Sequence, residues 1–248
     1  MVITFSHNKK NYQADLAIPI DISIPLQSGN ANPNTFFLNE PIFEPVRANN
    51  FIGSVALGGN CNCENLSINA HGNGTHTECV GHISNEKITI NKSLKTFFSI
   101  AQLISIKPKS QSNGDKVVML DDVKNILDNS AESIVLRTLP NDESKCIQNY
   151  SGANPTYVQE EFCEFLAQKN IKHFLLDLPS VDKESDEGKL LAHHAFWQYP
   201  LKPRLDATIS EMIYVPTKIE DGMYLLNIQI ASFESDASPS KPLLYKLF

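Results

Sequence analysis

Short segments in which apolar and polar residues alternate open the chain. Residues 2–6 and 12–18 flank a polar turn at 7–11, and this pattern predicts an N-terminal β-hairpin. Residues 20–26 and 65–71 alternate in the same way, which predicts two further half-buried strands. We therefore expect the first third of the chain to contain mainly strands and loops.

Longer apolar segments predict a mixture of buried strands and helices in the rest of the chain. Two short apolar runs, 133–139 and 172–178, are typical of strands that are covered on both faces. Apolar residues at helical spacing predict helices at 120–129, 154–170 and 187–199. Strand patterns return at 207–215, 222–233 and 243–247. Strands outnumber helices and the two alternate, which indicates an α/β fold.

No feature of the sequence divides the chain into separate domains. Residues 27–50 are rich in Asn and Pro and predict a long loop, a type of segment that is often functional. Residues 107–116 predict a surface loop, because no shift in composition surrounds them. There is no internal repeat, and we expect residues 1–248 to form a single domain.

Composition and charge exclude several classes of protein. The chain has 248 residues, 42% of them hydrophobic and 20% charged, as in ordinary globular proteins. A net charge of -7 without a basic cluster argues against nucleic acid as a partner. No window approaches the ~20 apolar residues of a membrane span, and no signal peptide precedes the first strand. Five cysteines, an odd number, indicate reduced thiols and a cytoplasmic location.

The segment HGNGTHTECVGH, residues 71–82, concentrates candidate metal ligands. In an extended chain the side chains of His76, Glu78 and His82 point to one side, because all three positions have the same parity. Two imidazoles and a carboxylate facing one volume indicate a metal or acid–base site. His71 has the opposite parity and joins them only if the backbone is irregular at 72–74. The sequence Gly-Asn-Gly there favours a β-bulge, and we expect one.

These residues resemble the signature of the cyclase family, which contains bacterial kynurenine formamidase and isatin hydrolase. That signature reads His-x-Gly-Thr-His-x-Asp-x-Pro-x-His, and residues 74–76, the acid at 78 and His82 match it in register. The chain departs from it in three ways: Glu78 replaces Asp, Val80 replaces Pro, and the first signature histidine falls on Gly72, next to His71.

Further family segments follow in order along the chain. They are DISIPL at 21–26, LRT at 136–138, LDLPSVD at 176–182, AHH at 192–194, Glu211 in a late strand and DASPSKP at 236–242. The resemblance therefore covers most of the sequence. It implies a swivelling β/β/α domain with mixed sheets and flanking helices. It also implies a homodimer or larger homo-oligomer in which the N-terminal segment reaches across an interface.

The resemblance assigns roles to individual residues. It implies one or two divalent ions, zinc or manganese, held by His71, His76, Glu78, His193 and Glu211. The last signature histidine, His82, is expected to be the general acid/base. A divalent metal suits amide hydrolysis because it polarises the carbonyl and lowers the pKa of bound water to about 7. We expect a hydrolase of a C–N bond in a small linear or cyclic amide, arylformamidase-like, with N-formylkynurenine of tryptophan catabolism as the family's best-known substrate.

Other interpretations of the same residues remain open at this point. Loss of the first signature histidine could leave a catalytically impaired descendant that binds a small molecule. Cys79 lies three residues before His82, and a thiol–imidazole hydrolase would use that pair, although strand parity places them on opposite sides. Cys61 and Cys63 could bind a soft metal together with His71. Asp177 and Asp182 are expected to shape the turn around Pro179 rather than to take part in chemistry.

Overall fold

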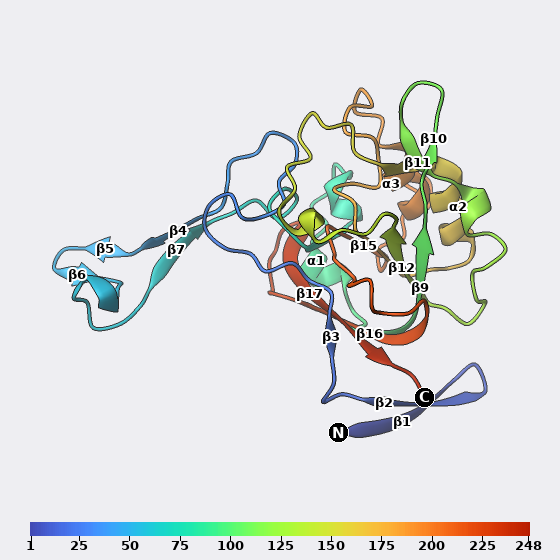
Figure 1. The fold of residues 1–248 in the computed structure, drawn as a ribbon, viewed down its shortest axis with the longest axis horizontal. Coiled ribbons are helices and arrows are strands. Elements are labelled where there is room, and N and C mark those ends of the chain that lie inside the picture. The colour runs from blue at the N-terminus through green and yellow to red at the C-terminus, as the bar shows by residue number, and fades with distance from the viewer.

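The computed structural model describes all 248 residues and is built around one large mixed β-sheet (Figure 1). The strands of this sheet are β3 (Ile20–Asp21), β8 (His76–Cys79), β9 (Phe98–Ile106), β12 (Ser133–Thr138), β14 (His173–Leu176), β15 (Thr208–Glu211), β16 (Gly222–Ile230) and β17 (Ala237–Lys246). They follow the spatial order β16-β9-β12-β14-β15-β8-β17-β3. Because β17 pairs with both β8 and β16, the sheet closes on itself.

Strand direction explains the sequence patterns of the sheet. Strands β9, β12, β14 and β15 are parallel to one another, and the central strands β12 and β14 contain apolar runs because both of their faces are covered. Strand β8 is antiparallel to β15 and to β17. The carboxyl ends of the four parallel strands meet at one edge of the sheet, which is where ligands bind in many open α/β sheets.

Two hydrophobic cores hold the helices and the sheet together. The α-helices are α1 (Ile90–Ser93), α2 (Glu160–Gln168) and α3 (Leu191–Trp197), and the 3-10 helices are η1 (Val55–Leu57), η2 (Val80–His82), η3 (Leu120–Asp122) and η4 (Glu143–Ile147). Helices α2 and α3 pack on one face of the sheet, where Phe162 and Phe196 meet Phe174. Side chains such as Leu103 and Leu244 fill the inside of the closed sheet. Each fully buried side chain of this size contributes about 1.5–3 kcal/mol.

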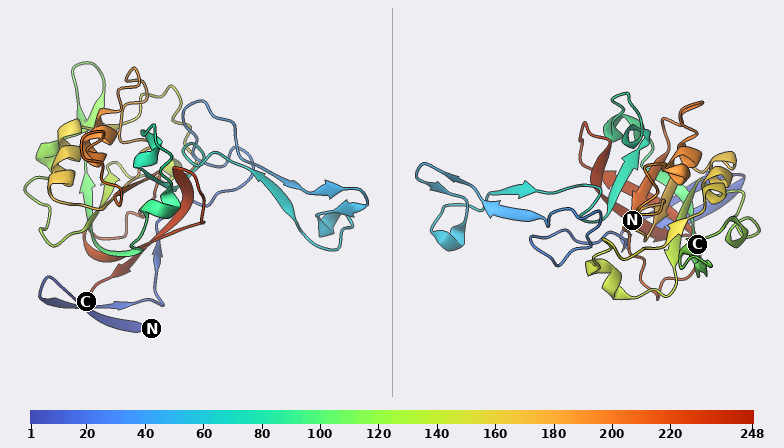
Figure 2. Two further views of the ribbon diagram at one scale, coloured as in Figure 1. Left: turned by 180° about the vertical axis from the view of Figure 1, so that it is seen from behind. Right: turned by 90° about the horizontal axis from the view of Figure 1, so that it is seen from above.

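Smaller sheets extend from this body. They contain β1 (Val2–His7), β2 (Lys10–Asp15), β4 (Ile42–Pro45), β5 (Arg47–Ala48), β6 (Phe51–Ile52), β7 (Glu64–Ser67), β10 (Lys109–Ser110), β11 (Lys116–Val118) and β13 (Tyr157–Val158). Residues 42–67 form a hairpin arm, built from β4–β7, that projects far from the sheet in every view (Figure 2). The two chain ends lie close together, because Gln13 and Phe248 exchange backbone hydrogen bonds.

Several predicted elements are confirmed. The N-terminal hairpin is present, and the runs at 133–139 and 172–178 contain β12 and β14. The patterns at 207–215 and 222–233 contain β15 and β16, and the pattern at 243–247 overlaps the end of β17, which begins earlier, at Ala237. Helices were predicted correctly near 160–168 and 191–197, although both are shorter than their apolar patterns. The architecture is the expected α/β type, a mixed sheet with flanking helices.

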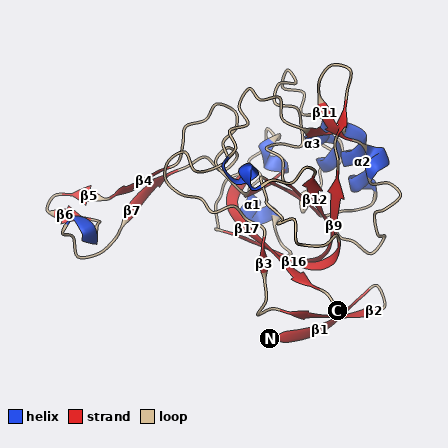
Figure 3. Cartoon of the chain, viewed as in Figure 1, coloured by secondary structure: helices blue, strands red, loops and turns tan.

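Other predictions were wrong in instructive ways. Residues 120–129 form the 3-10 helix η3 followed by turns and loop rather than one helix, although Asp122 caps the start of η3 by accepting the backbone N–H of Met119. The strand expected at 20–26 stops at Asp21, and residues 22–41 are almost entirely loop (tan in Figure 3). The loop expected at 27–50 contains β4 and β5 of the arm. No helix of the structure combines the length and apolar character that crossing a membrane requires.

Candidate metal centre

A tight turn delivers His71 to the site. The side-chain oxygen of Asn73 accepts the N–H of Asn69 at 2.7 Å, and the side-chain oxygen of Asn69 accepts the N–H of Gly72 at 3.2 Å. Residues 70–74 are therefore turn and bend rather than strand, and β7 ends earlier, at Ser67. The expected irregular backbone is confirmed, but the irregularity is a turn stabilised by Asn side chains and not the predicted β-bulge.

Gly72 explains why the displaced histidine is the one that faces the site. A Cβ atom built on Gly72 would lie 2.3 Å from Cδ1 and 3.4 Å from Cβ of Leu38, so a side chain at 72 would point at Leu38. His71 instead places its Nδ1 atom 3.1 Å from Oε2 of Glu78. In this backbone, position 71 is therefore the one that reaches the carboxylate.

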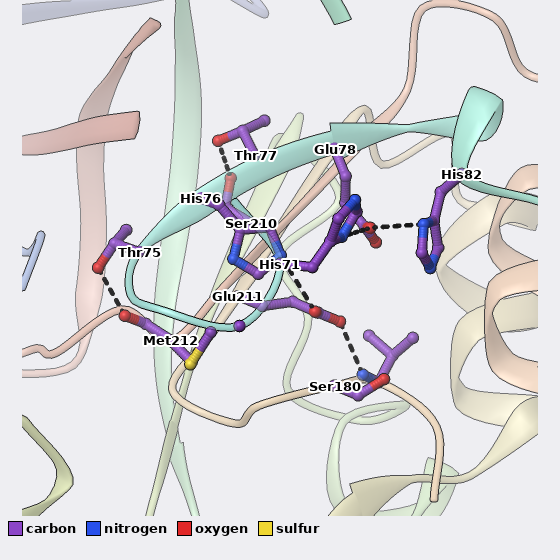
Figure 4. Close-up of polar contacts among 12 residues, drawn as sticks. His71, Thr75, His76, Thr77, Glu78, His82, Ser180, Ser210, Glu211 and Met212 are labelled. Atoms are coloured by element: carbon purple, nitrogen blue, oxygen red, sulfur yellow. Dashed lines mark hydrogen bonds and ion pairs between the residues drawn. The ribbon is translucent and has the colours of Figure 1, made fainter. Parts of the chain in front are cut away.

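Two neighbouring strands present the next set of side chains. His76 of β8 lies directly opposite Glu211 of β15, and its Nε2 atom is 3.4 Å from the Oε2 atom of Glu211. Glu78, two residues along β8, emerges on the same face as His76, as strand parity requires. The other oxygen of Glu211 accepts the N–H of Val181 at 2.9 Å, which fixes the carboxylate (Figure 4).

Helix α3 supplies the third histidine. The Nε2 atom of His193 is 3.0 Å from Oε1 of Glu78, and its Nδ1 atom is 2.6 Å from Oδ2 of Asp182. Asp182 also accepts the N–H of Ala192 at 2.8 Å, in the first turn of α3. The ring of Trp197, which is fully buried, lies 5.4 Å from the ring of His193 and supports it from one side.

Each of the three histidines is oriented in the same manner. One ring nitrogen is held by an outer acceptor: Asp236 for His71 at 2.8 Å, the carbonyl of Gly74 for His76 at 3.0 Å and Asp182 for His193. The other nitrogen faces Glu78 or Glu211. Histidines that bind metals are typically held in this way, because an outer acceptor fixes the tautomer and the ring plane.

Unpartnered buried atoms complete the geometric case for a cation. His76 Nε2 is buried and has no hydrogen-bond partner, and the buried Oε2 atom of Glu78 has an ion-pair contact with His71 at 3.1 Å but no hydrogen bond. The Nδ1 atom of His76 donates to a carbonyl, so its Nε2 atom carries a lone pair rather than a proton. A lone pair and a carboxylate oxygen without donors are costly to bury alone. Imidazole nitrogens and carboxylate oxygens are the donor set of zinc and of similar divalent ions, so the residues present fit such a metal.

The electrostatics of the metal-free site show how its charges balance. Burial opposes ionisation of Glu78, but the charges of His82 and His193 hold its pKa well below its usual range. Burial also opposes a charge on His71, yet its hydrogen bond to Asp236 and the neighbouring negative charge of Glu78 raise its pKa to about 10. The same competition raises the pKa of His193, with Glu78 as the strongest favourable partner. Two protonated imidazoles therefore neutralise the buried carboxylates when no metal is bound.

His82 reaches the same region by a route that strand parity did not predict. The strand ends at Cys79, and His82 lies in the 3-10 helix η2, so residues 76–82 are not extended throughout. Its ring nevertheless stacks on that of His71, with centroids 4.3 Å apart. Its Nδ1 atom lies 3.2 Å from Oδ2 of Asp236 and 3.8 Å from Oε2 of Glu78. The structure thus brings together all six residues singled out in the sequence: His71, His76, Glu78, His82, His193 and Glu211. All of them except His193 are labelled in Figure 4.

Two aspartates contact the site in ways that the sequence analysis missed. Asp182 was expected only to shape a turn, but it binds His193. Asp236 was not selected as a site residue, and it contacts both His71 and His82. Two signals for Asp236 exist: it is the first residue of the family segment DASPSKP, and its neighbour is paired in the sheet. Ala237 pairs with Glu78, so the residue before it must lie beside the motif strand.

Asp177 instead accepts the N–H of Thr138 and pairs with Lys145 at 2.7 Å, away from the histidines.

The cysteines do not contribute to this cluster. Cys79 is buried, its Sγ atom faces the carbonyl of Ile88 at 3.7 Å, and burial raises the pKa of its thiol. No thiol–imidazole pair is formed with His82. Cys61 and Cys63 are exposed and lie on the arm, which projects away from the body that carries His71 (Figure 1). The structure therefore supports neither a cysteine nucleophile nor a soft-metal site.

Comparison with known proteins places this geometry in a family. Residues 14–183 match the family model described as "Putative cyclase". A kynurenine formamidase of Bacillus cytotoxicus is 26% identical over 191 residues, which cover 76% of this chain and 82% of that relative. A solved isatin hydrolase bound to thioisatinate superposes with a TM-score of 0.62 at 12% identity, covering 92% of each chain. A predicted metal-dependent hydrolase from Bacillus stearothermophilus superposes with a TM-score of 0.61 at 15% identity, covering 92% of this chain and 98% of its own.

Proposed function

Because this chain belongs to the cyclase family, we propose that it is a metal-dependent hydrolase that cleaves a C–N bond in a small linear or cyclic amide. The observation that carries the proposal is the convergence of three oriented histidines and two buried glutamates on one volume. His71, His76, Glu78, His193 and Glu211 would hold one or two divalent ions, zinc or manganese. A cation in this place polarises the substrate carbonyl and makes water a stronger nucleophile at neutral pH.

His82 is the proposed general acid/base. Its side chain is the most exposed of the four histidines in the cluster, and one ring nitrogen is held by Asp236. The second nitrogen, Nε2, has no protein partner and remains free to exchange a proton with the substrate. A neutral imidazole at this position accepts a proton from the attacking water and returns it to the leaving nitrogen.

The proposed substrate is a small aromatic amide, with N-formylkynurenine as the first candidate. Two of the proteins similar to this chain carry the names kynurenine formamidase and isatin hydrolase, which supports an aromatic substrate. Phe36 and Phe37 lie in the loop that the N–H of Thr35 ties to the carbonyl of Gly72. Both adopt left-handed backbone angles, φ 57° and 56°, and Phe37 is 78% exposed. Such strain is concentrated at functional sites, and these rings are available to stack on an aromatic substrate.

We also propose that the chain forms a homodimer or a larger homo-oligomer. The arm exposes Ile42, Val55, Leu57 and Leu66, apolar side chains that a second copy could cover. A two-stranded hairpin is only marginally stable in water without such support. Light scattering coupled to size-exclusion chromatography tests this proposal, and a strictly monomeric chain at micromolar concentration would contradict it.

The decisive experiment separates metal binding from turnover. Protein purified without added metal should contain zinc or manganese, and removal of that metal should abolish hydrolysis of aromatic formamides. His76→Ala should lose the metal, whereas His82→Ala should keep it and lose turnover by about 10²–10⁴-fold. His194→Ala, adjacent to the site ligand His193, is the matched control and should change neither. Full activity after verified metal removal would refute the metal mechanism. A metal-free wild-type protein without activity would favour a small-molecule binder descended from the enzymes.

A further inference from the structure

One carboxylate oxygen contacts two different histidines of the site. Oδ2 of Asp236 lies 2.8 Å from Nε2 of His71 and 3.2 Å from Nδ1 of His82. The two imidazole rings are stacked on each other, so the carboxylate lies at the edge of the pair. Asp236 is the one carboxylate outside the proposed ligand set that contacts both the proposed ligand His71 and the proposed base His82. Glu78 lies near both, but it is itself a proposed ligand.

Asp236 is held firmly enough to orient its neighbours. Its backbone carbonyl accepts the N–H of Cys79 at 3.0 Å, which ties it to the motif strand. Its second oxygen, Oδ1, accepts the hydroxyl of Ser235 at 3.0 Å. The next residue, Ala237, is paired with Glu78 in the sheet. The position of the carboxylate is therefore set by the same strand that carries the metal ligands.

Hydrogen-bond chemistry then fixes the tautomer of each histidine. A carboxylate accepts and does not donate, so the ring nitrogen that faces it must carry the proton. For His71, Asp236 retains the proton on Nε2, so that Nδ1, which faces Glu78, is the nitrogen that a metal would bind. For His82 the proton lies on Nδ1, which leaves the lone pair on Nε2. A proton on Nδ1 of His82 is thus the state in which Nε2 can act as a base.

We propose that Asp236 is the positioning residue of this site, which sets the metal-facing nitrogen of His71 and the base nitrogen of His82 through a single carboxylate oxygen. This inference rests on the proposed function for its catalytic meaning, but its structural content does not depend on any substrate. Asp236 links the metal centre to the acid/base, so that one substitution should disturb both. An asparagine at this position would place a neutral amide against both imidazoles. Its oxygen accepts less strongly than a carboxylate oxygen, and in the opposite orientation its N–H group would face both rings.

The test uses the full chain and two readouts that need no turnover. In metal-free wild-type protein, ¹⁵N NMR of the imidazoles should show His82 protonated on Nδ1. Asp236→Asn should shift His82 toward the Nε2-protonated form and weaken zinc binding by about 10–100-fold, the usual effect of losing an outer carboxylate. Glu234→Gln is the matched control, because Glu234 lies on the same loop but bonds only Thr89 and Asn91 in addition to pairing with Lys92. It should leave both readouts unchanged.

A conservative variant keeps the proposal falsifiable if asparagine prevents folding. Asp236→Glu retains a carboxylate and should preserve the Nδ1-protonated form of His82. Thermal melting of each variant establishes that it is folded. Wild-type zinc affinity and an unchanged His82 tautomer in folded Asp236→Asn would overturn the proposal, and so would equal effects in Glu234→Gln. If these readouts behave as expected but no amide is hydrolysed, the proposed function fails while the positioning role of Asp236 stands.

Discussion

Binding of a divalent metal should release protons from His71 and His193. Both imidazoles are protonated in the metal-free site, since their carboxylate partners raise the pKa of His71 to about 10 and that of His193 well above its usual value. Coordination requires a lone pair on each ring, so each ligand must first lose its proton. We therefore expect one proton from each of the two histidines for a metal that both residues bind.

The size of the effect follows from the pKa of His71. Each pKa unit corresponds to about 1.4 kcal/mol, so removing a proton at pH 7 from a group with a pKa of about 10 costs roughly 4 kcal/mol of metal affinity. The direction of the pH dependence is fixed. His71 holds its proton below its pKa in the folded protein, so the cost of removing this proton for metal binding falls as the pH rises toward that pKa. Apparent affinity should rise about tenfold per pH unit for each proton released, or about a hundredfold for two.

Calorimetric titration with zinc in buffers of different ionisation enthalpy counts these protons directly between pH 6 and 9. His71→Gln should reduce the release by one proton. His194→Gln is the matched control, because His194 bonds the carbonyl of Tyr199 outside the cluster, and its release should equal that of the wild type. A zinc affinity that does not change with pH would refute the proposed ligand role of His71. So would a proton release by the His71→Gln variant equal to that of the wild type.

Three further predictions concern neighbouring residues. Gly72→Ala should destabilise the fold by about 1–3 kcal/mol, because the added Cβ atom meets Leu38. In thermal melting, a second substitution, Leu38→Ala, should restore part of this loss of stability. Gly74→Ala is the control and should cost less, because its Cβ atom would lie 3.8 Å from the nearest atom. Asp182→Asn should weaken zinc binding about 10–100-fold, because His193 loses the carboxylate that orients its ring. Asp186→Asn, in the same loop, is the control and should bind zinc as the wild type does. Equal zinc affinities of the two variants would show that His193 needs no orientation by Asp182. Alkylation should modify the exposed Cys61 and Cys63 first without loss of turnover, and inactivation that follows modification of Cys79 in mass spectrometry would revive a thiol mechanism.

The sequence predicts those parts of the fold in which local pattern and burial agree. The apolar runs around Val135 and Leu175 are covered on both faces, so their pattern alone identifies strands. In the arm, the strand predicted at 65–71 overlaps β7, whereas β4 was not predicted, because β4 and β7 pair only with each other and have no buried face to impose alternation. The short strands β5 and β6 lie there too. Local pattern also fails at 120–129, where the chain forms a 3-10 helix and turns although its apolar residues have helical spacing.

The same distinction applies to the site. The resemblance to the cyclase signature, together with parity, identifies His76 and Glu78, which occupy a regular strand. His82 faces the site as parity predicted, but the reason differs. The strand has already ended at Cys79, and the 3-10 helix η2 directs the side chain of His82 to the site. Asp182 and Asp236 act through partners that are distant in sequence: 11 residues separate Asp182 from His193, and 165 separate Asp236 from His71. Contacts of this kind depend on how α3 and β17 pack, and a single sequence does not encode them as a local pattern.

Closure of the sheet also governs when the site forms during folding. Strands β8 and β15 are joined by contacts such as that between Thr77 and Ser210, 133 residues apart. Contacts of such long range form late, because the chain entropy of closing the loop must be overcome first. A metal that binds only the completed site would then stabilise the native state more than the folding transition state. It should slow unfolding while leaving the rate of folding nearly unchanged, so that the cation would act on the lifetime of the folded protein rather than on its formation.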